Sequence, residues 1–306
     1  MRALVTGGAG FIGSHVVDAL QAVGDEVLVV DHLSRGHSDN LSDAFARGAE
    51  LVQADVTDVA AMTRTFDRFR PEVVYHLAAQ IDVRASVKDP TVDAHVNLGG
   101  TAGVLEAARH AGARRVVLAS TAGVYGDPQQ VPTPEHAPVA PLSPYGASKA
   151  AAETYMALYQ RLYGISTVCL RMANVYGPRQ DPHGEAGVVA IFTSAAAEGR
   201  VATVFGDGSQ TRDYVFVGDV ARAFVAAGRS RAAGAINVST GRETSILELA
   251  GALGLQITYA AARVGEIQRS VLDASRARDE LFWEPRVPLS EGLARTLPAF
   301  DLGLAS

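Results

Sequence analysis

The 306-residue chain has one cysteine, Cys169, so it can form no internal disulfide bond and offers no cysteine-built metal site. It has no run approaching the ~20 consecutive apolar residues that a membrane span requires. Its formal net charge is -6 with both signs scattered, which provides no basic surface for nucleic acid or for an anionic membrane. We therefore expect no metal, membrane or nucleic-acid partner. A start without a signal-peptide pattern favours the cytoplasm.

A glycine-rich turn follows the first apolar run, residues 2–6, and precedes a helical pattern. Its Gly7, Gly10 and Gly13 let backbone amides approach a phosphate, and the start of a helix favours negative charge there. Asp31 ends the next apolar run, about twenty residues past the turn, where a carboxylate can accept hydrogen bonds from ribose hydroxyls. The same carboxylate repels a 2′-phosphate. The pattern predicts a dinucleotide site that prefers NAD to NADP.

Apolar runs and helical patterns alternate through the first 172 residues. We expect further strands, each followed by a helix or a loop, at 51–54, 72–77, 115–120 and 165–171. This order is typical of a parallel sheet that helices cover on both faces. The predicted fold class is therefore α/β, a Rossmann-type doubly wound parallel sheet of six or seven strands.

The pattern becomes irregular after Arg171, where prolines and glycines cluster within 174–187. We interpret this as the crossing into a smaller C-terminal α/β lobe that binds the substrate. A helical pattern at 217–228 and an apolar run at 235–238 indicate a return to the first domain. The expected NAD-binding domain is thus 1–172 with about 216–242, and the expected substrate lobe is 173–215 with 243–306.

Small and polar side chains gather where the predicted strands end, which is the edge where ligands bind in such sheets. Ala78 and Ala79 end one strand, and their small size either lets a flat cofactor lie close or serves packing alone. Ser120 and Thr121 end another strand and are expected to bring hydroxyls to the crevice. Asn97 interrupts an alanine-rich helix, where it can orient a neighbouring loop.

Tyr145 and Lys149 lie four residues apart at the start of a strongly helical segment, so their side chains share one face. An ammonium beside a phenol lowers the pKa of the phenol, which makes tyrosine a usable base near neutral pH. Tyrosine and lysine at this spacing are also a common surface pair. The glycine turn, Asp31 and Thr121 elsewhere in the chain favour the catalytic interpretation.

These motifs together resemble the extended short-chain dehydrogenase/reductase superfamily, and over essentially all 306 residues the chain is most similar to its UDP-sugar 4-epimerases, of the UDP-glucose 4-epimerase kind. The resemblance implies an NAD-dependent isomerase that acts on a UDP-sugar, with UDP-glucose and UDP-galactose the expected pair. Tyr145 takes the proton of the sugar 4-hydroxyl, while Lys149 binds the nicotinamide ribose and lowers the pKa of the tyrosine. Thr121 bridges the 4-hydroxyl and Tyr145, and Ser120 positions the sugar. Hydride passes to bound NAD and returns to the other face of a 4-keto intermediate.

The resemblance also implies which residues hold the two ligands. The cofactor contacts, besides Tyr145 and Lys149, are Gly7, Gly10, Phe11, Ile12, Gly13, Asp31, Asp55, Val56, Leu77, Ala78, Ala79 and Asn97. The substrate contacts in the second lobe are Asn174, Arg212 and Arg263 for the diphosphate, Phe205 and Val188 for the uracil, and Glu266 for the ribose. Each of these arginines, taken singly, is also compatible with a solvated surface charge.

Three positions depart from relatives in the superfamily. Ala122-Gly123 replaces the Asp-Glu pair that dehydratases use to expel water, which argues against a 4,6-dehydratase. Ser270 stands where some relatives have a bulky tyrosine beside the sugar, so UDP-N-acetylglucosamine is an alternative substrate. Asp181 replaces an arginine typical of relatives that act on UDP-glucuronate. That disfavours a uronate substrate, although a carboxylate still has candidate partners in Arg84, Arg179 and His183.

Two other classes of protein share these motifs. A net oxidoreductase of nucleotide sugars uses the same tyrosine and lysine but consumes or releases NADH. A non-enzymatic dinucleotide sensor on this fold commonly lacks the tyrosine or the lysine, and both are present here. In related enzymes the helices equivalent to 91–111 and 145–163 form a four-helix dimer interface, so we expect a homodimer.

Overall fold

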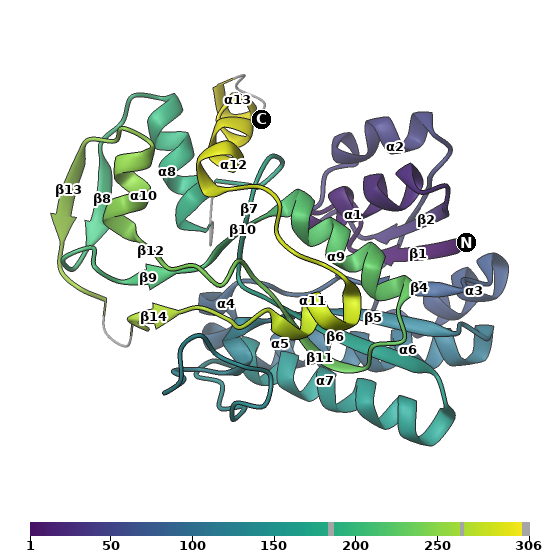
Figure 1. The fold of residues 1–306 in the computed structure, drawn as a ribbon. Coiled ribbons are helices and arrows are strands. Elements are labelled where there is room, and N and C mark those ends of the chain that lie inside the picture. Colours follow the sequence, from purple (N-terminus) through teal and green to yellow (C-terminus); the bar gives the residue numbers. More distant parts are fainter. Residues whose placement is uncertain (183–186, 264–265, 302–306) are drawn as a thin grey trace.

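A computed structural model describes residues 1–182, 187–263 and 266–301 of the chain (Figure 1). Its larger domain is built on a parallel seven-stranded sheet of order β11-β6-β5-β4-β1-β2-β3. The strands are β1 (Arg2–Thr6), β2 (Glu26–Asp31), β3 (Glu50–Gln53), β4 (Val73–His76), β5 (Arg115–Thr121), β6 (Ser166–Met172) and β11 (Gly234–Val238). The predicted strands are thus confirmed, and β11 brings the chain back to the edge of the first sheet.

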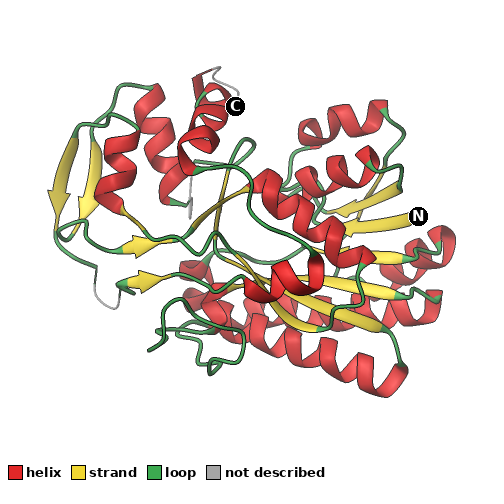
Figure 2. Cartoon of the chain, viewed as in Figure 1, coloured by secondary structure: helices red, strands yellow, loops and turns green. Residues whose placement is uncertain are grey.

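Helices cover both faces of this sheet (Figure 2), because its strands have apolar side chains on both faces. One face packs against α1 (Phe11–Ala22) and α9 (Val217–Arg229). The other packs against α3 (Val59–Phe69), α6 (Gly100–Ala111) and α7 (Pro144–Tyr163). Shorter elements at the ends of β2 and β4 are a 3-10 turn (Ser38–Leu41), α2 (Ser42–Ala46) and α4 (Val83–Lys88). The predicted doubly wound α/β class is confirmed.

The helix expected over 91–111 is not continuous. It is divided into α5 (Pro90–Ala94), a π-helical turn (His95–Gly99) and α6. Gly99 and Gly100 weaken the local preference for an α-helix. The Thr101 hydroxyl also donates to the Asn97 carbonyl at 2.5 Å, within the wider turn. The turn directs Asn97 into the interior, where it is buried.

The smaller lobe packs its own apolar core, separate from the two faces of the large sheet. Its helices are α8 (Val188–Ala197), α10 (Ile246–Ala252), α12 (Leu289–Thr296) and α13 (Pro298–Asp301), while α11 (Ser275–Leu281) packs on the large domain. Its strands pair as β8 (Ala202–Phe205) with β13 (Ile257–Ala260), β9 (Thr211–Arg212) between β12 (Thr244–Ser245) and β14 (Arg269–Ser270), and β7 (Asn174–Tyr176) with β10 (Tyr214–Phe216). The residue boundaries predicted between the two domains stay a prediction. No helix within the described ranges is both long and apolar enough to cross a bilayer.

Candidate active site

The glycine turn packs backbone against backbone. Gly7 has a left-handed φ of 69°, and a Cβ atom there would lie 2.6 Å from the amide nitrogen of Ala78. A Cβ atom on Gly13 would lie 2.0 Å from the carbonyl oxygen of Gly7. Gly10 is the N-cap of α1, and no side chain caps that end of the helix. The first amides of α1 are therefore available to an anion, and the cradle fits the pyrophosphate of a dinucleotide.

Asp31 ends β2 beside this turn and is buried. Its carboxylate accepts hydrogen bonds from the backbone amides of Ala9 at 3.0 Å and Leu33 at 2.8 Å. Each carboxylate oxygen has a second acceptor position, so these two bonds leave capacity for ribose hydroxyls. The backbone amides of Ala9 and Leu33 thus hold the Asp31 carboxylate in position.

The other predicted cofactor residues lie at the same edge of the sheet or just past it. Phe11 and Ile12 form the first turn of α1, and Leu77, Ala78 and Ala79 follow β4. Asp55 and Val56 follow β3, and they differ in their surroundings. The Asp55 carboxylate accepts from the amide and hydroxyl of Thr57 at 2.9 and 2.8 Å, whereas Val56 is buried against α6. Their contacts with a cofactor stay predictions.

The structure brings the predicted catalytic residues together at the end of β5. Ser143 accepts from the Gly146 amide at 3.1 Å and caps α7, so Tyr145 lies in the first turn of the helix. The Thr121 hydroxyl accepts from the Gly123 amide at 3.1 Å, and it lies close enough to the Tyr145 phenol to favour the phenolate. One turn further along α7, Lys149 donates to the Ala119 carbonyl at 2.9 Å.

Burial dominates the titration of both groups. It raises the pKa of Tyr145 to about 12, against the opposing hydrogen bond with Thr121, and Asp93 adds to the rise. It lowers the pKa of Lys149 to about 8, although the carboxylates of Asp93 and Glu153 favour the charged form. The lowering of the Tyr145 pKa by Lys149 in the NAD-bound enzyme therefore stays a prediction. The ammonium is directed at a carbonyl of β5, and desolvation of the phenol is the larger effect.

We expect Lys149→Met to stabilise the fold near neutral pH. The native pKa of about 8 lies below the ordinary 10.5, so between these values the unfolded chain binds more protons than the folded one. Stability contributed by this group therefore rises with pH across that window, and below it the buried charge opposes folding. At pH 7 the variant should gain about 1–3 kcal/mol in the free energy of unfolding, shrinking towards zero near pH 10. Urea unfolding of both proteins at several pH values measures this; a difference independent of pH would contradict it.

The predicted contact of Asn97 with the cofactor stays a prediction. Its side-chain amide donates to the Gln80 carbonyl, to Asp93 and to Ser148, and its oxygen accepts from the Gln80 amide at 2.8 Å. The side chain is buried. Asn97 thus ties the segment after β4 to α7, because the π-helical turn directs it inward.

The predicted contact of Ser120 with the sugar stays a prediction. The residue is buried, and its hydroxyl donates to Glu153 on α7. Glu153 and its partner Arg171 were missed by the sequence analysis. The signal for Glu153 is its spacing, since Tyr145, Lys149 and Glu153 follow one another at intervals of four residues on α7.

The predicted substrate residues form two contacts in the smaller lobe. The Arg263 guanidinium lies over the Phe205 ring, 4.0 Å from its centroid. Arg212 lies 3.6 Å from the Glu266 carboxylate, and its strand β9 pairs with β14 so that Arg212 is in register with Ser270. Val188 begins α8 and Asn174 begins β7.

The residues that could bind the carboxylate of a uronate substrate differ in their surroundings. Arg179 already donates to Asp18 on α1 at 2.8 Å, which reduces its availability to a uronate. Arg84 lies on α4, and His183 lies outside the described residues.

A Rossmann domain that places a tyrosine and a lysine of one helix beside a strand-end threonine, with a second lobe attached, defines an extended short-chain dehydrogenase/reductase. More narrowly, the NAD dependent epimerase/dehydratase family model matches residues 3–239, and the chain belongs to this family. The cofactor of this enzyme class is NAD.

Three similar proteins match this chain along nearly their whole length. The UDP-glucose 4-epimerase of Mycolicibacterium smegmatis is 52% identical over 313 residues, which cover 98% of each chain. A crystal structure of the Thermotoga maritima UDP-glucose 4-epimerase with UDP-glucose has a TM-score of 0.95 at 44% identity, covering 99% of this chain and 100% of that one. The Thermus thermophilus UDP-glucose 4-epimerase in complex with NAD has a TM-score of 0.91 at 43% identity, with coverage of 98% and 99%.

Proposed function

We propose that the protein is an NAD-dependent UDP-sugar 4-epimerase that interconverts UDP-glucose and UDP-galactose in the cytoplasm. The observation that carries the proposal is the placement of the Tyr145 phenol beside Thr121 at the end of β5, one helical turn from Lys149. Ala122 and Gly123 follow Thr121 directly, so this turn supplies no acid or base for eliminating water. The site is built to move one proton, reversibly, at one hydroxyl.

The mechanism follows from these side chains. Tyr145 accepts the proton of the sugar 4-hydroxyl and later returns it, while the neighbouring Thr121 hydroxyl helps to orient the two oxygens and favours the phenolate. The glycine turn, Asp31 and Lys149 would hold NAD, which would supply a reversible hydride acceptor for C4 of the sugar and a positive ring that favours the phenolate. A reaction that takes a hydride from C4 and gives it back to C4 has no net redox change.

The sugar has to turn within the site, so its binding energy should come from the rest of the molecule. Arg212 and Arg263 are suited to a diphosphate because the planar guanidinium matches two phosphate oxygens. Phe205, with Arg263 stacked on it, offers a flat apolar face for the uracil. Asn174, Val188 and Glu266 are the other proposed substrate contacts.

The direct test is to incubate the purified protein with UDP-galactose and follow the formation of UDP-glucose. We expect interconversion without added reductant or oxidant and without accumulation of NADH. Stoichiometric NADH formation would instead identify a net oxidoreductase. Failure to interconvert any UDP-hexose, in protein shown to contain NAD, would overturn the proposal.

Ser270 is the proposed determinant of sugar size. It lies on β14, in register with Arg212 on β9, and its small side chain leaves room beside the sugar. We expect turnover of UDP-N-acetylglucosamine as well as UDP-glucose. Ser270→Tyr should reduce kcat/KM for the N-acetylated substrate by about 10–100-fold, with a much smaller effect on UDP-glucose. A side-by-side assay that includes UDP-glucuronate measures this, and equal losses for both hexose substrates would contradict the role.

We also propose a homodimer formed through α6 and α7. The C-terminal half of α7 exposes Leu162 and Tyr163, which are 61% and 53% accessible in the single chain. Large apolar side chains gathered on one helix are typical of an interface. Light scattering at micromolar concentration should give twice the monomer mass of 32.0 kDa. A monomer under those conditions would exclude the dimer, and Leu162→Glu should shift the mass towards the monomer.

A further inference from the structure

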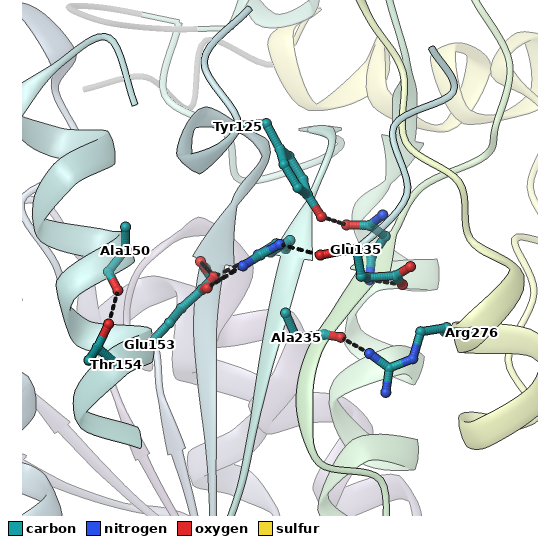
Figure 3. Close-up of polar contacts among 10 residues, drawn as sticks. Tyr125, Glu135, Ala150, Glu153, Thr154, Ala235 and Arg276 are labelled. Carbon is teal, nitrogen blue, oxygen red and sulfur yellow. Dashed lines mark hydrogen bonds and ion pairs between the residues drawn. The ribbon is translucent and has the colours of Figure 1, made fainter. Parts of the chain in front are cut away.

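A buried ion pair lies directly behind the catalytic residues, where Figure 3 shows Glu153 on α7. Its carboxylate accepts from Arg171 at 2.6 Å, and the two side chains are 11% and 6% exposed. Arg171 also donates through its Nε atom, at 3.0 and 3.2 Å. The Ser120 hydroxyl is a further donor to the same carboxylate. Glu153 is thus bonded to the two neighbouring strands β5 and β6.

These bonds set the position of α7 against β5. Lys149 donates to the carbonyl of Ala119 and Glu153 accepts from the hydroxyl of Ser120, so two successive turns of the helix hold two successive residues of the strand. The next residue of that strand is Thr121 and the preceding turn of that helix carries Tyr145. A shift of the helix by a fraction of a turn would separate these two hydroxyls.

Arg171 also contacts the chain segment that follows β5. Its guanidinium lies over the Tyr125 ring, 4.7 Å from the centroid, and donates to the Glu135 carbonyl at 3.3 Å. The Tyr125 hydroxyl donates to Asn237 on β11 at 2.8 Å (Figure 3). Tyr125 follows the 3-10 turn (Ala122–Val124) that begins after Thr121. The Glu153–Arg171 pair therefore contacts the chain on both sides of this turn, at Ser120 and at Tyr125.

Stability alone does not account for such a pair. The desolvation of two buried charges offsets much or all of their attraction, so an apolar pair of the same size often stabilises a fold as well or better. What the charges add here is direction, because a carboxylate with three donors fixes the relative position of a helix and two strands.

We propose that Glu153 is a positioning residue of the reaction: its carboxylate fixes α7, which carries Tyr145 and Lys149, in register with the end of β5, which carries Thr121. The inference rests on the proposed function of these three residues. Glu153 itself lies behind the site, on the side of α7 that faces the sheet.

A groove gives solvent access to this pair and makes the proposal testable by chemical rescue. It has a volume of about 840 Å³ and is lined by α7, β6 and β11, including Ala150, Glu153, Thr154, Arg171 and Ala235. Three of its lining residues, Ala150, Thr154 and Ala235, are seen around Glu153 in Figure 3. If Glu153 is truncated to alanine, a small carboxylate from solvent can reach the vacated donors of Ser120 and Arg171.

The experiment compares Glu153→Ala with Thr154→Val in the full-length, NAD-containing protein. Thr154 lines the same groove, and its hydroxyl donates at 3.2 Å to Ala150 within the helix, so its replacement is a matched control. Glu153→Ala should lower kcat on the order of 100-fold, with KM changed less than about threefold, since the diphosphate contacts lie in the other lobe. Sodium formate should restore about tenfold of the lost kcat, whereas sodium chloride at equal ionic strength should not. Thr154→Val should keep wild-type kcat.

Amide hydrogen exchange provides a readout that does not depend on turnover. Peptides covering residues 119–126 should lose protection in Glu153→Ala and regain it in formate, and Thr154→Val should show neither change. If Glu153→Ala does not fold, Ser120→Ala takes its place, because it removes only the bond from strand to helix. That variant should lower kcat about 3–10-fold without raising KM.

Unchanged kcat and exchange in Glu153→Ala, or losses that formate restores in neither measurement, would overturn the positioning role. A wild-type protein without epimerase activity would count against the proposed function only. The exchange measurement would still decide whether Glu153 holds the strand and the helix in register.

Discussion

Tyr145→Phe should reduce kcat by about 10²–10⁴-fold while NAD stays bound. The substitution removes one oxygen from a partly buried ring, so the packing of α7 is retained. What is lost is the acceptor for the 4-hydroxyl proton. Lys149 cannot take its place because its ammonium donates to the Ala119 carbonyl, and the neutral Thr121 hydroxyl is a much weaker base than a phenolate. KM should change little, because binding energy comes mainly from the nucleotide diphosphate.

The matched control for this substitution is Tyr155→Phe. Tyr155 lies on the same helix, and its side chain is partly exposed, so loss of its hydroxyl should leave kcat unchanged. Initial rates with UDP-galactose, together with the NAD content of each purified protein, separate catalysis from cofactor binding. Full activity in Tyr145→Phe would show that another group takes the proton.

Gly13→Ala should weaken NAD binding by about 10–100-fold. The added Cβ would lie 2.0 Å from the carbonyl oxygen of Gly7 and 2.8 Å from the Cα atom of Gly8, and both are backbone atoms that no rotamer change can move. The turn must therefore open, which displaces the amides at the start of α1 from the position that a pyrophosphate needs. Overpacking of this kind also costs about 1–3 kcal/mol of folding stability.

Gly251→Ala is the control, since a Cβ atom there meets nothing within 4 Å and the residue lies in α10 of the other lobe. It should leave NAD binding unchanged and stabilise the helix by up to about 1 kcal/mol. Isothermal titration with NAD after removal of bound cofactor gives the affinities, and urea unfolding gives the stabilities. Wild-type affinity in Gly13→Ala would mean that the close approach of Gly13 to Gly7 is not what forms the cradle.

Several features of the site could not be predicted from local sequence patterns. The π-helical turn at Asn97 depends on a hydroxyl and an amide that find partners in the folded chain, among them Ser148, 51 residues away. The direction of Ser120 depends on which strand residue faces which layer of helices. The raised pKa of Tyr145 depends on burial, which a spacing of four residues does not reveal.

The sequence by itself determined the parallel α/β class, the glycine turn with Asp31, and the pairing of Tyr145 with Lys149. Each of these rests on short-range periodicity or on a motif in one continuous segment. Only the tertiary structure decided that Ser120 donates to Glu153, and that Glu153 meets Arg171 from a different strand. The physical reason is that hydrogen bonds between segments far apart in the chain depend on side-chain direction and burial, and these are fixed when the layers of the fold pack together.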